Sequence, residues 1–223
     1  MIKFPRMPPE QAQVVVISAS VGAGHTGAAE ELVRRLVRRG VSTTHYDYLD
    51  ALPRALRWVL CRGYTFSVGY APWFFQWLFR GVDGSGWVHW MALLVCRLAH
   101  RRVLRWCMGG AVVVSTYMLA SQTLGQLKVL GRLRCPVVTF VPDPAVHRLW
   151  IHAGVEHHWA VTTTGAREAS DRFGIPVRPV AALVDARFGA PVPEWRRDTL
   201  RNALDIPGGE LTVLLAAGSL GLG

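Results

Sequence analysis

Short apolar runs alternate with helical patterns along most of the chain. Runs of the kind found in buried strands span residues 14–18, 41–46, 111–115, 137–141, 158–161 and 177–180. Helical patterns lie between them, at residues 28–39, 119–130 and 165–173. Valine-rich strands without polar alternation are typical of a parallel sheet covered on both faces. The pattern therefore predicts a doubly wound α/β fold.

The first strand, helix and second strand form a βαβ unit of ordinary length. The helix places Leu32, Val33, Leu36 and Val37 on one face, and Gly40 follows its basic last turn as a C-terminal cap. The strand at residues 41–46 runs into the acidic segment 47–50. Such a unit predicts parallel pairing through a right-handed crossover.

The predicted domain boundaries lie where the alternation of strand and helix patterns is interrupted. We expect residues 1–190 to form one Rossmann-like domain and residues 191–210, which are rich in proline and glycine around a short helix at 195–204, to form a linker. Residues 211–223 repeat the pattern of an apolar strand running into glycines. They are expected to be the first strand and turn of a truncated second domain.

A basic, aromatic insertion of two or more helices is predicted between the second and third strands. Residues 54–106 contain eight arginines and a single acidic residue, Asp83, which gives a local charge of +7 within a chain of net charge +10. Six of the nine tryptophans also lie there. This composition suits anionic lipid headgroups, single-stranded nucleic acid, or a helical region with buried tryptophans and solvated arginines.

The overall composition narrows the class of protein. Hydrophobic residues make up 51% of the chain and the mean hydropathy is +0.22, but Gly69 and Pro72 interrupt one uncharged window and polar residues interrupt the other. Neither window is typical of a lipid-spanning helix. The four cysteines lack CxxC spacing, which argues against a zinc site or a disulfide framework. Secretion is not indicated, because the apolar run at 14–19 is too short for a signal-peptide core.

The glycine-rich turn at residues 20–27 is the strongest candidate for a chemical site. Gly22, Gly24 and Gly27 satisfy G-x-G-x-x-G between a strand and a helix, and Asp47 lies 20 residues beyond Gly27. That spacing matches a dinucleotide-binding fingerprint and predicts an NAD(P)-dependent oxidoreductase as one alternative. His25, however, would crowd a pyrophosphate and is well placed to accept a proton.

Two further segments end at the same predicted edge of the sheet. Asp143, His147 and Trp150 follow the strand at 137–141, and Ser115 and Thr116 end the strand at 111–115. Loops at the carboxyl ends of parallel strands bind ligands in open α/β sheets, so these residues are expected to lie beside His25. The prolines at 142 and 144 and the spacing of the histidines do not favour a metal site.

Four segments in order resemble the monogalactosyldiacylglycerol synthase family of glycolipid glycosyltransferases. They are SASVGAGHTGAAEEL, VVVSTYMLASQ, VTFVPDPAVHRLWIHAGVEHHWAV and VLLAAGSLGLG. The family is related to the enzyme that adds N-acetylglucosamine to the peptidoglycan lipid precursor. The resemblance implies the N-terminal half of a GT-B fold with a helical aromatic and basic insertion.

What the resemblance implies is inverting transfer of a hexosyl group from a UDP-sugar to a diacylglycerol-type lipid, without a cofactor or metal. It assigns His25 as the general base and places the donor diphosphate and acceptor beside a turn formed by Ser20, Gly22, Ala23 and Gly24. Positioning roles in the cleft fall to Ser115, Thr116, Asp143, His147 and Trp150. Contact with an anionic membrane surface is expected from Trp73, Trp77, Arg97, Arg101 and Arg102.

The resemblance also implies partners and a location. We expect a peripheral protein on the cytoplasmic, inner face of the cell membrane, with no nucleic-acid partner. The family binds the nucleotide sugar mainly in its C-terminal domain, so the chain as given is expected to be inactive alone. Pro142, and Tyr117 with Met118, depart from the family's usual residues and affect the prediction of the acceptor. A non-enzymatic domain that binds lipid or a partner half is the remaining alternative.

Overall fold

The computed structural model describes residues 13–21, 23–61, 86–208 and 210–213. Two compact units are distinguished, Met1–Leu183 and Val184–Gly223. Each is treated separately below.

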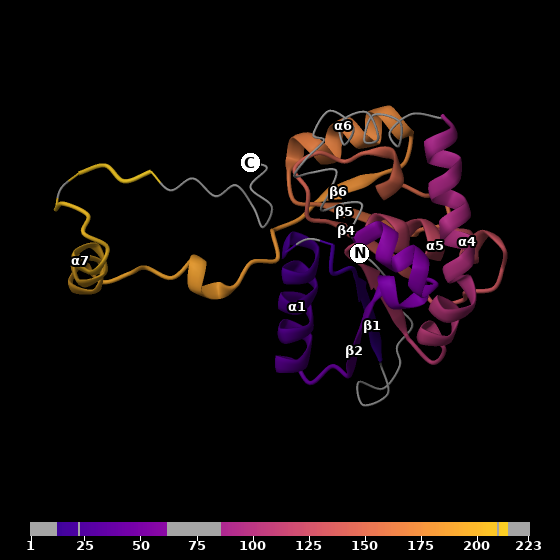
Figure 1. Ribbon diagram of the computed structural model, residues 1–223, viewed down its shortest axis with the longest axis horizontal. Helices are drawn as coiled ribbons and strands as arrows, with labels where there is room; N and C mark the ends of the chain where they lie inside the picture. The colour runs from indigo at the N-terminus through magenta and orange to yellow at the C-terminus, as the bar shows by residue number, and fades with distance from the viewer. Residues whose placement is uncertain (1–12, 22, 62–85, 209, 214–223) are drawn as a thin grey trace. The chain divides into compact units, whose positions relative to one another are not determined.

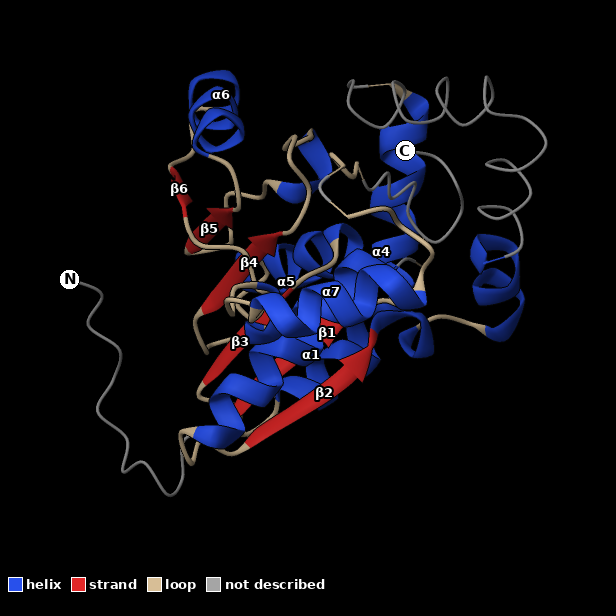
Figure 2. Cartoon of the chain, turned by 90° about the vertical axis from the view of Figure 1, so that its left-hand side faces the viewer, coloured by secondary structure: helices blue, strands red, loops and turns tan. Residues whose placement is uncertain are grey.

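The first unit is built on a six-stranded, fully parallel sheet in the order β2-β1-β3-β4-β5-β6. In Figure 2 the arrows of β2, β3 and β4 accordingly point the same way. The strands are β1 (Val14–Ser18), β2 (Thr43–Asp47), β3 (Val112–Ser115), β4 (Val137–Val141), β5 (His157–Ala160) and β6 (Val177–Pro179). The predicted α/β, Rossmann-like class is confirmed.

Helices follow the strands in alternation and cover both faces of the sheet. They are α1 (Ala23–Arg38), α4 (Trp87–Cys107), α5 (Met118–Val129) and α6 (Thr163–Phe173), with short 3₁₀ turns η1 (Tyr48–Ala51) and η2 (Arg148–Trp150). Residues 54–61 are also helical. Helix α1 packs on β1 and β2, whereas α5 packs on β3 and β4 and is contacted by α4 (Figure 1).

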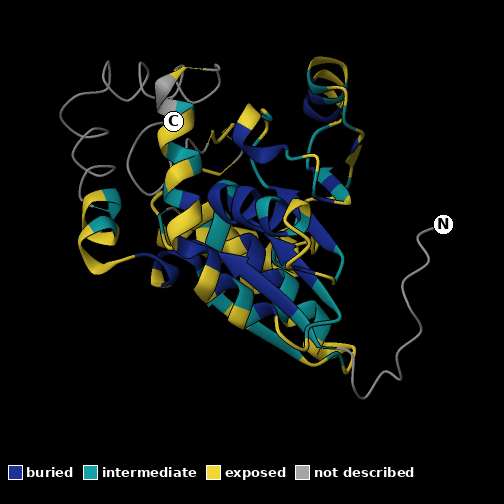
Figure 3. Cartoon of the chain, turned by 90° about the vertical axis from the view of Figure 1, so that its right-hand side faces the viewer, coloured by how far each residue is buried: buried dark blue, intermediate teal, exposed yellow. Residues whose placement is uncertain are grey.

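Because successive side chains along a strand point to opposite faces, the sheet has a core on each side. Val15, Ile17, Val113 and Val137 belong to the core that includes residues of α4 and α5. Ala28 of α1 belongs to the other, with Val114, Val138 and Phe140. The inner strands β1, β3 and β4 are therefore mostly buried, between helices with exposed outer positions (Figure 3).

Helix α1 begins five residues earlier than the hydrophobic pattern predicted, at Ala23 rather than Ala28. Its buried face also differs from the prediction. Val37 is exposed, whereas the carboxylate of Glu31 is buried and paired with Arg34 and Arg35 one turn further along. Ion pairing within the helix compensates the burial of this charge.

The insertion between β2 and β3 is described only in part. Helix α4 begins directly after Gly86, which agrees with the predicted break at residues 83–86. Trp73 and Trp77 lie outside the described residues. Among the residues that are described, no helix combines the length and the apolar character that a membrane crossing requires.

The second unit contains η3 (Ala186–Phe188) and the helix α7 (Glu194–Ala203), which buries none of its residues. Arg201 of α7 donates hydrogen bonds to Thr212 Oγ1 at 3.0 Å and to the carbonyl of Glu210 at 3.0 Å. Residues 211–213 have no regular structure, and residues 214–223, the rest of the predicted strand and turn, lie outside the described part. The predicted linker at 191–210 and strand at 211–223 stay predictions.

Candidate functional site

His25 lies in the first turn of α1, at the carboxyl edge of the sheet between β1 and β3. The chain leaves β1 in one direction to form β2 and the sheet continues in the other through β3, so this is the topological switch point. Open α/β sheets bind ligands at such points. Two threonines hold the turn. Thr116 Oγ1 donates to the carbonyl of His25 at 3.0 Å, and Thr26 Oγ1 donates to the carbonyl of Ala19 at 3.2 Å.

The imidazole of His25 is half-buried between two aromatic rings. Its centroid lies 5.7 Å from that of Tyr117 in an edge-to-face arrangement, and 5.7 Å from that of Trp150 at an interplanar angle of 47°. The Nδ1 atom is buried and has no hydrogen-bond partner among the described residues. Within the described part of the chain, packing and the backbone of α1 orient the ring, and no carboxylate bonds to Nδ1.

The loop after β4 brings the second predicted group of residues to His25. Trp150 is fully buried in η2, and its Nε1 donates to Asp143 Oδ2 at 3.2 Å. His147 is buried, with its ring centroid 6.1 Å from that of Trp150. Trp150 therefore contacts His25 directly, whereas Asp143 and His147 contact Trp150. Trp150 forms a wall of the site within the core, rather than an exposed contact.

Helix α6 closes the far side of this loop. Thr162 caps the helix by accepting a hydrogen bond from the amide of Gly165, and its hydroxyl donates to the carbonyl of Pro144 at 2.8 Å. A Cβ atom at Gly165 would lie 2.5 Å from that same carbonyl oxygen. The absence of a side chain therefore allows α6 to approach the loop.

Ser115 and Thr116 lie one residue apart but have different surroundings. Both side chains are fully buried. Thr116 contacts His25. Ser115 Oγ instead accepts a hydrogen bond from Ser121 Oγ at 3.0 Å, and Ser121 Oγ in turn accepts one from Thr139 Oγ1 at 2.9 Å. Ser115 consequently belongs to a buried hydroxyl network that joins α5 to β3 and β4, and it is not among the residues that contact His25.

Asp47 has a different role from that in a dinucleotide site. Its Oδ2 accepts a hydrogen bond from Ser20 Oγ at 2.6 Å, and its Oδ1 accepts one from the amide of Leu49 at 2.9 Å. Both carboxylate oxygens are thus bonded within the protein, where they anchor the start of the glycine turn, whereas a dinucleotide site would use them to bind the ribose. The third glycine of that fingerprint normally permits close contact between helix and strand, yet a Cβ atom at Gly27 would meet nothing within 4 Å. Both observations disfavour the oxidoreductase alternative.

Of the glycine-turn residues, Ser20, Ala23 and Gly24 are exposed and Gly22 lies outside the described residues. Ala23 and Gly24 begin α1, whose first turn contains no acidic side chain. The amides of a first helical turn have no partner within the helix and form the positive end of its dipole. This part of the edge can therefore receive an anionic group.

Two site residues were not assigned from the sequence. Tyr117 contacts His25 directly, and the signal that could have indicated it is its position immediately after the carboxyl end of β3. Tyr48 supports Tyr117, with ring centroids 5.6 Å apart, and shares a hydrogen bond of 2.8 Å with Thr123 Oγ1. Burial raises the pKa of the Tyr48 hydroxyl well above its ordinary value, so it remains protonated.

The histidines at the other end of the loop have structural partners. His158 is buried in β5 and accepts a hydrogen bond from the amide of His152 at 3.3 Å, while His152 Nδ1 accepts one from the amide of Gly154 at 2.9 Å. Burial lowers the pKa of His158 to about 4, with His152 and His157 adding to the effect. In the described part of the chain, no three His, Cys, Asp or Glu side chains form a group that could hold a metal ion.

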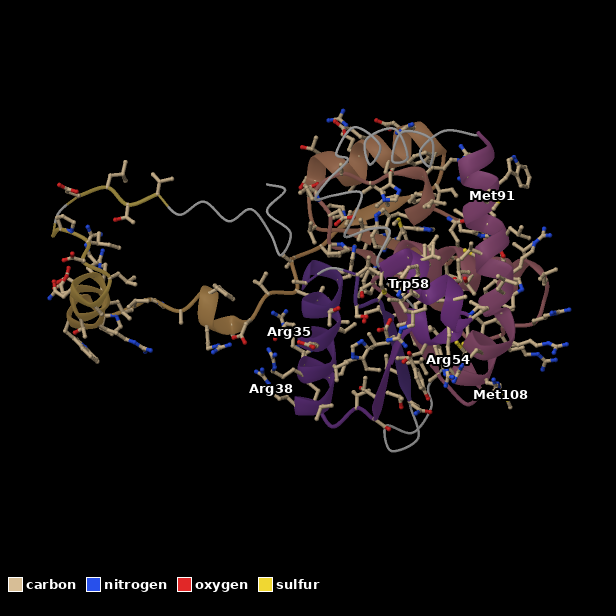
Figure 4. All side chains as sticks on the ribbon, viewed as in Figure 1. Arg35, Arg38, Arg54, Trp58, Met91 and Met108 are labelled. Atoms are coloured by element: carbon tan, nitrogen blue, oxygen red, sulfur yellow. The ribbon has the colours of Figure 1, made fainter. Side chains whose placement is uncertain are left out.

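The outer face of α4 is both apolar and basic. Trp90, Met91, Leu94 and Leu98 are each at least half exposed. Arg97, Arg101, Arg102 and Arg105 are exposed further along the same helix, between Met91 and Met108, which are labelled in Figure 4. Amphipathic helices of this composition lie at membrane surfaces. The predicted contact residues Arg97, Arg101 and Arg102 thus share one exposed helical face.

A groove of about 1130 Å³ runs along α4 beside α5, α6 and η2. The described side chains that line it include no acidic residue. They combine apolar groups such as Leu94 and Ile151 with Arg97, Arg148 and Arg172. Arg148 is the first residue of η2 and Ile151 follows its last residue, Trp150, which contacts His25. The groove and the His25 site therefore lie on two sides of one short turn.

Comparison with protein-family models finds a match over residues 25–183 to monogalactosyldiacylglycerol (MGDG) synthase. The match begins at His25, includes the loop at 142–151 and ends where the first compact unit ends. Comparisons with characterised proteins and with solved structures return no match.

Proposed function

Because the chain belongs to the monogalactosyldiacylglycerol synthase family, and so to the glycosyltransferases of glycolipid synthesis, we propose that it forms the acceptor-side domain of an inverting hexosyltransferase. The donor is a UDP-sugar and the acceptor a diacylglycerol-type lipid. The observation that carries the proposal is His25, held at the switch point of the sheet by Thr116, Tyr117 and Trp150.

His25 acts as the general base in this reaction. With Nδ1 buried against the protein, Nε2 is the nitrogen that meets the acceptor. It removes the proton of the lipid hydroxyl while that oxygen attacks the anomeric carbon of the sugar. The bond from that carbon to the diphosphate oxygen breaks on the opposite face, and UDP leaves with the electron pair. The product has inverted configuration and His25 carries the proton.

The first turn of α1 supports departure of the diphosphate. Negative charge develops on the leaving oxygen, and the amides of Ala23 and Gly24 belong to the first turn, the positive end, of a 16-residue helix. Ser20 contributes by its bond to Asp47, which fixes the start of the turn. Gly22 is assigned to the same turn from the sequence alone.

The lipid acceptor is reached from a membrane surface through α4. The exposed apolar side chains of its first turns fit the depth of the headgroups, and the arginines that follow fit their phosphates. The groove beside α4 adds a surface of apolar and arginine side chains that leads to η2. We propose a peripheral protein on the inner face of the cell membrane, with Trp73 and Trp77 extending the contact.

The test of the base is substitution of His25 in the complete protein. We expect His25→Ala to lower transfer from UDP-sugar to diacylglycerol in vesicles by roughly 10²- to 10⁴-fold, the usual share of general-base catalysis. The control is His157→Ala at the amino end of β5, away from the site, which should retain activity. Unchanged turnover of His25→Ala would remove His25 from the mechanism.

The exposed face of α4 also supports a second candidate, a domain that binds lipid without catalysis. The two functions separate in one experiment. Both candidates would sediment with anionic vesicles whether or not His25 is present, but a complete protein that only binds lipid would show no transfer of labelled sugar.

A further inference from the structure

Gln122 is a buried amide at the centre of α5, with 3% of its surface exposed. Its Nε2 donates one hydrogen bond to the carbonyl of Leu149 and one to the carbonyl of Ile151, both at 2.9 Å. A side-chain amide has two N–H donors, and here both are used. The two carbonyls belong to the residues immediately before and after Trp150.

Trp150 is thereby held in place from two directions. Gln122 fixes the backbone on both sides of it, and Asp143 accepts the hydrogen bond from its indole nitrogen at 3.2 Å. The ring fixed in this way is the one that lies 5.7 Å from the imidazole of His25. A displacement of η2 would carry Trp150 away from His25 and leave that side of the imidazole unsupported.

Gln126, one turn later on α5, uses the same functional group for a different purpose. Its Oε1 is 2.8 Å from His100 Nε2, and its Nε2 donates to the carbonyl of Leu93 at 3.4 Å. Both partners belong to α4. Gln126 therefore holds two helices together, whereas Gln122 holds the loop that carries Trp150. The two glutamines form a matched pair for experiment.

We propose that Gln122 is a positioning residue for the transfer reaction, which sets Trp150 against the imidazole of His25 through its two hydrogen bonds to η2. The proposal rests on the proposed function in that His25 is the base that benefits. Gln122 does not contact substrate in this role. Its effect passes through the backbone of Leu149 and Ile151.

The test compares Gln122→Met with Gln126→Met in the complete protein. Methionine has nearly the length and volume of glutamine but donates no hydrogen bond. Gln122→Met is expected to lower kcat by about 10- to 100-fold, the cost of a misplaced catalytic group, with little change in the KM for UDP-sugar. Both glutamines line the groove beside α4, so any effect of a changed groove lining on the lipid acceptor is common to the two variants. Gln126→Met is expected to lower thermal stability, with a loss of kcat well below that of Gln122→Met, because the backbone around Trp150 keeps both of its hydrogen bonds to Gln122.

A spectroscopic measurement separates positioning from general destabilisation. The aromatic rings beside His25 shift the NMR resonance of its Hε1 proton, which His25→Gln assigns by its disappearance. At one fixed pH, Gln122→Met should displace that resonance and Gln126→Met should leave it in place. An unmoved resonance in folded Gln122→Met, or equal displacement in both variants, would overturn the proposal.

The outcome remains decisive in two difficult cases. If Gln122→Met does not fold, Gln122→Asn retains a buried amide that is too short to reach both carbonyls, and the same resonance is measured. If His25→Ala proves fully active, the assignment of the base fails, but the resonance still reports whether Gln122 positions the ring. In a His25→Ala background that is impaired, adding Gln122→Met should cause no further loss of kcat, whereas an additive loss would contradict action through His25.

Discussion

The hydroxyl of Thr116 donates a hydrogen bond to the main-chain carbonyl of His25 over 3.0 Å, between residues 91 positions apart in the sequence. Thr116 follows the last residue of β3 and is fully buried. The bond ties the carboxyl end of one strand to the first turn of the helix that follows its neighbour. The orientation of His25 is therefore set from its backbone as well as from the rings beside it.

Removing this hydroxyl should impair transfer without removing His25. Thr116→Val keeps the shape of the side chain but removes this donor from the carbonyl of His25, which lies within the hydrogen-bonded backbone of α1, at a cost of roughly 0.5–1.5 kcal/mol. We expect a loss of kcat of at least about tenfold, since the error in position falls on the base itself. Thr116→Ser retains the donor and should stay near the activity of the parent. Steady-state transfer assays on both variants make the comparison, and equal activity would show that the bond does not position His25.

Charge reversal on α4 should abolish binding to anionic vesicles. Each basic residue near such a surface contributes about 1 kcal/mol, so Arg97→Glu, Arg101→Glu and Arg102→Glu together should weaken binding by more than about 100-fold. Co-sedimentation with vesicles that contain anionic phospholipid measures the effect. The control reverses three exposed arginines elsewhere, Arg38, Arg39 and Arg178, with the same change in net charge. Equal losses in both triple variants would indicate that net charge, not the α4 face, governs binding.

Replacing either of two helical glycines by alanine should change the stability of the fold, with opposite signs. A Cβ atom at Gly125 in α5 would lie 2.3 Å from the ring of His152, whereas one at Gly27 in α1 would meet nothing within 4 Å. Gly125→Ala should therefore destabilise the fold by about 1–3 kcal/mol through overpacking. Gly27→Ala should stabilise it by about 0.5–1 kcal/mol, because alanine is the better helix former. Urea unfolding of both variants tests the pair. A stable Gly125→Ala would mean that the His152 ring can move at little cost.

The buried His158 makes stability depend on pH in a defined window. Its pKa falls from 6.5 to about 4 in the folded protein, so between these values the unfolded chain binds more protons. The contribution of His158 is complete above pH 6.5 and is lost as the pH falls to about 4, a difference of roughly 3 kcal/mol. His158→Gln, whose amide oxygen can accept the bond from His152, should flatten this part of the curve. Urea unfolding between pH 4 and 7 measures it, and an identical slope in the variant would exclude His158 as the cause.

The order and class of most elements could be predicted from the sequence because their signal is local. The bounds predicted for β1 and β4 agree with the structure, since short runs of β-branched and aromatic residues without polar alternation favour a buried parallel strand. The start of α1 was wrong by five residues. Glycines 24 and 27 have low helix propensity, so the pattern indicated a turn, whereas Thr26 and Thr116 stabilise the first turn of the helix through partners outside it.

The chemical types at the site could also be predicted, because strand ends in a parallel sheet converge at one edge. The sequence by itself determined that His25, Thr116 and the loop with Asp143 and Trp150 would come to the same edge of a doubly wound sheet. Only the tertiary structure decided their roles. Burial and partners at long sequence separation made Trp150 a wall, Asp47 an anchor for Ser20, and Gln122 the support of η2. Those contacts depend on how α5 and the loops pack, which no local pattern of residues encodes.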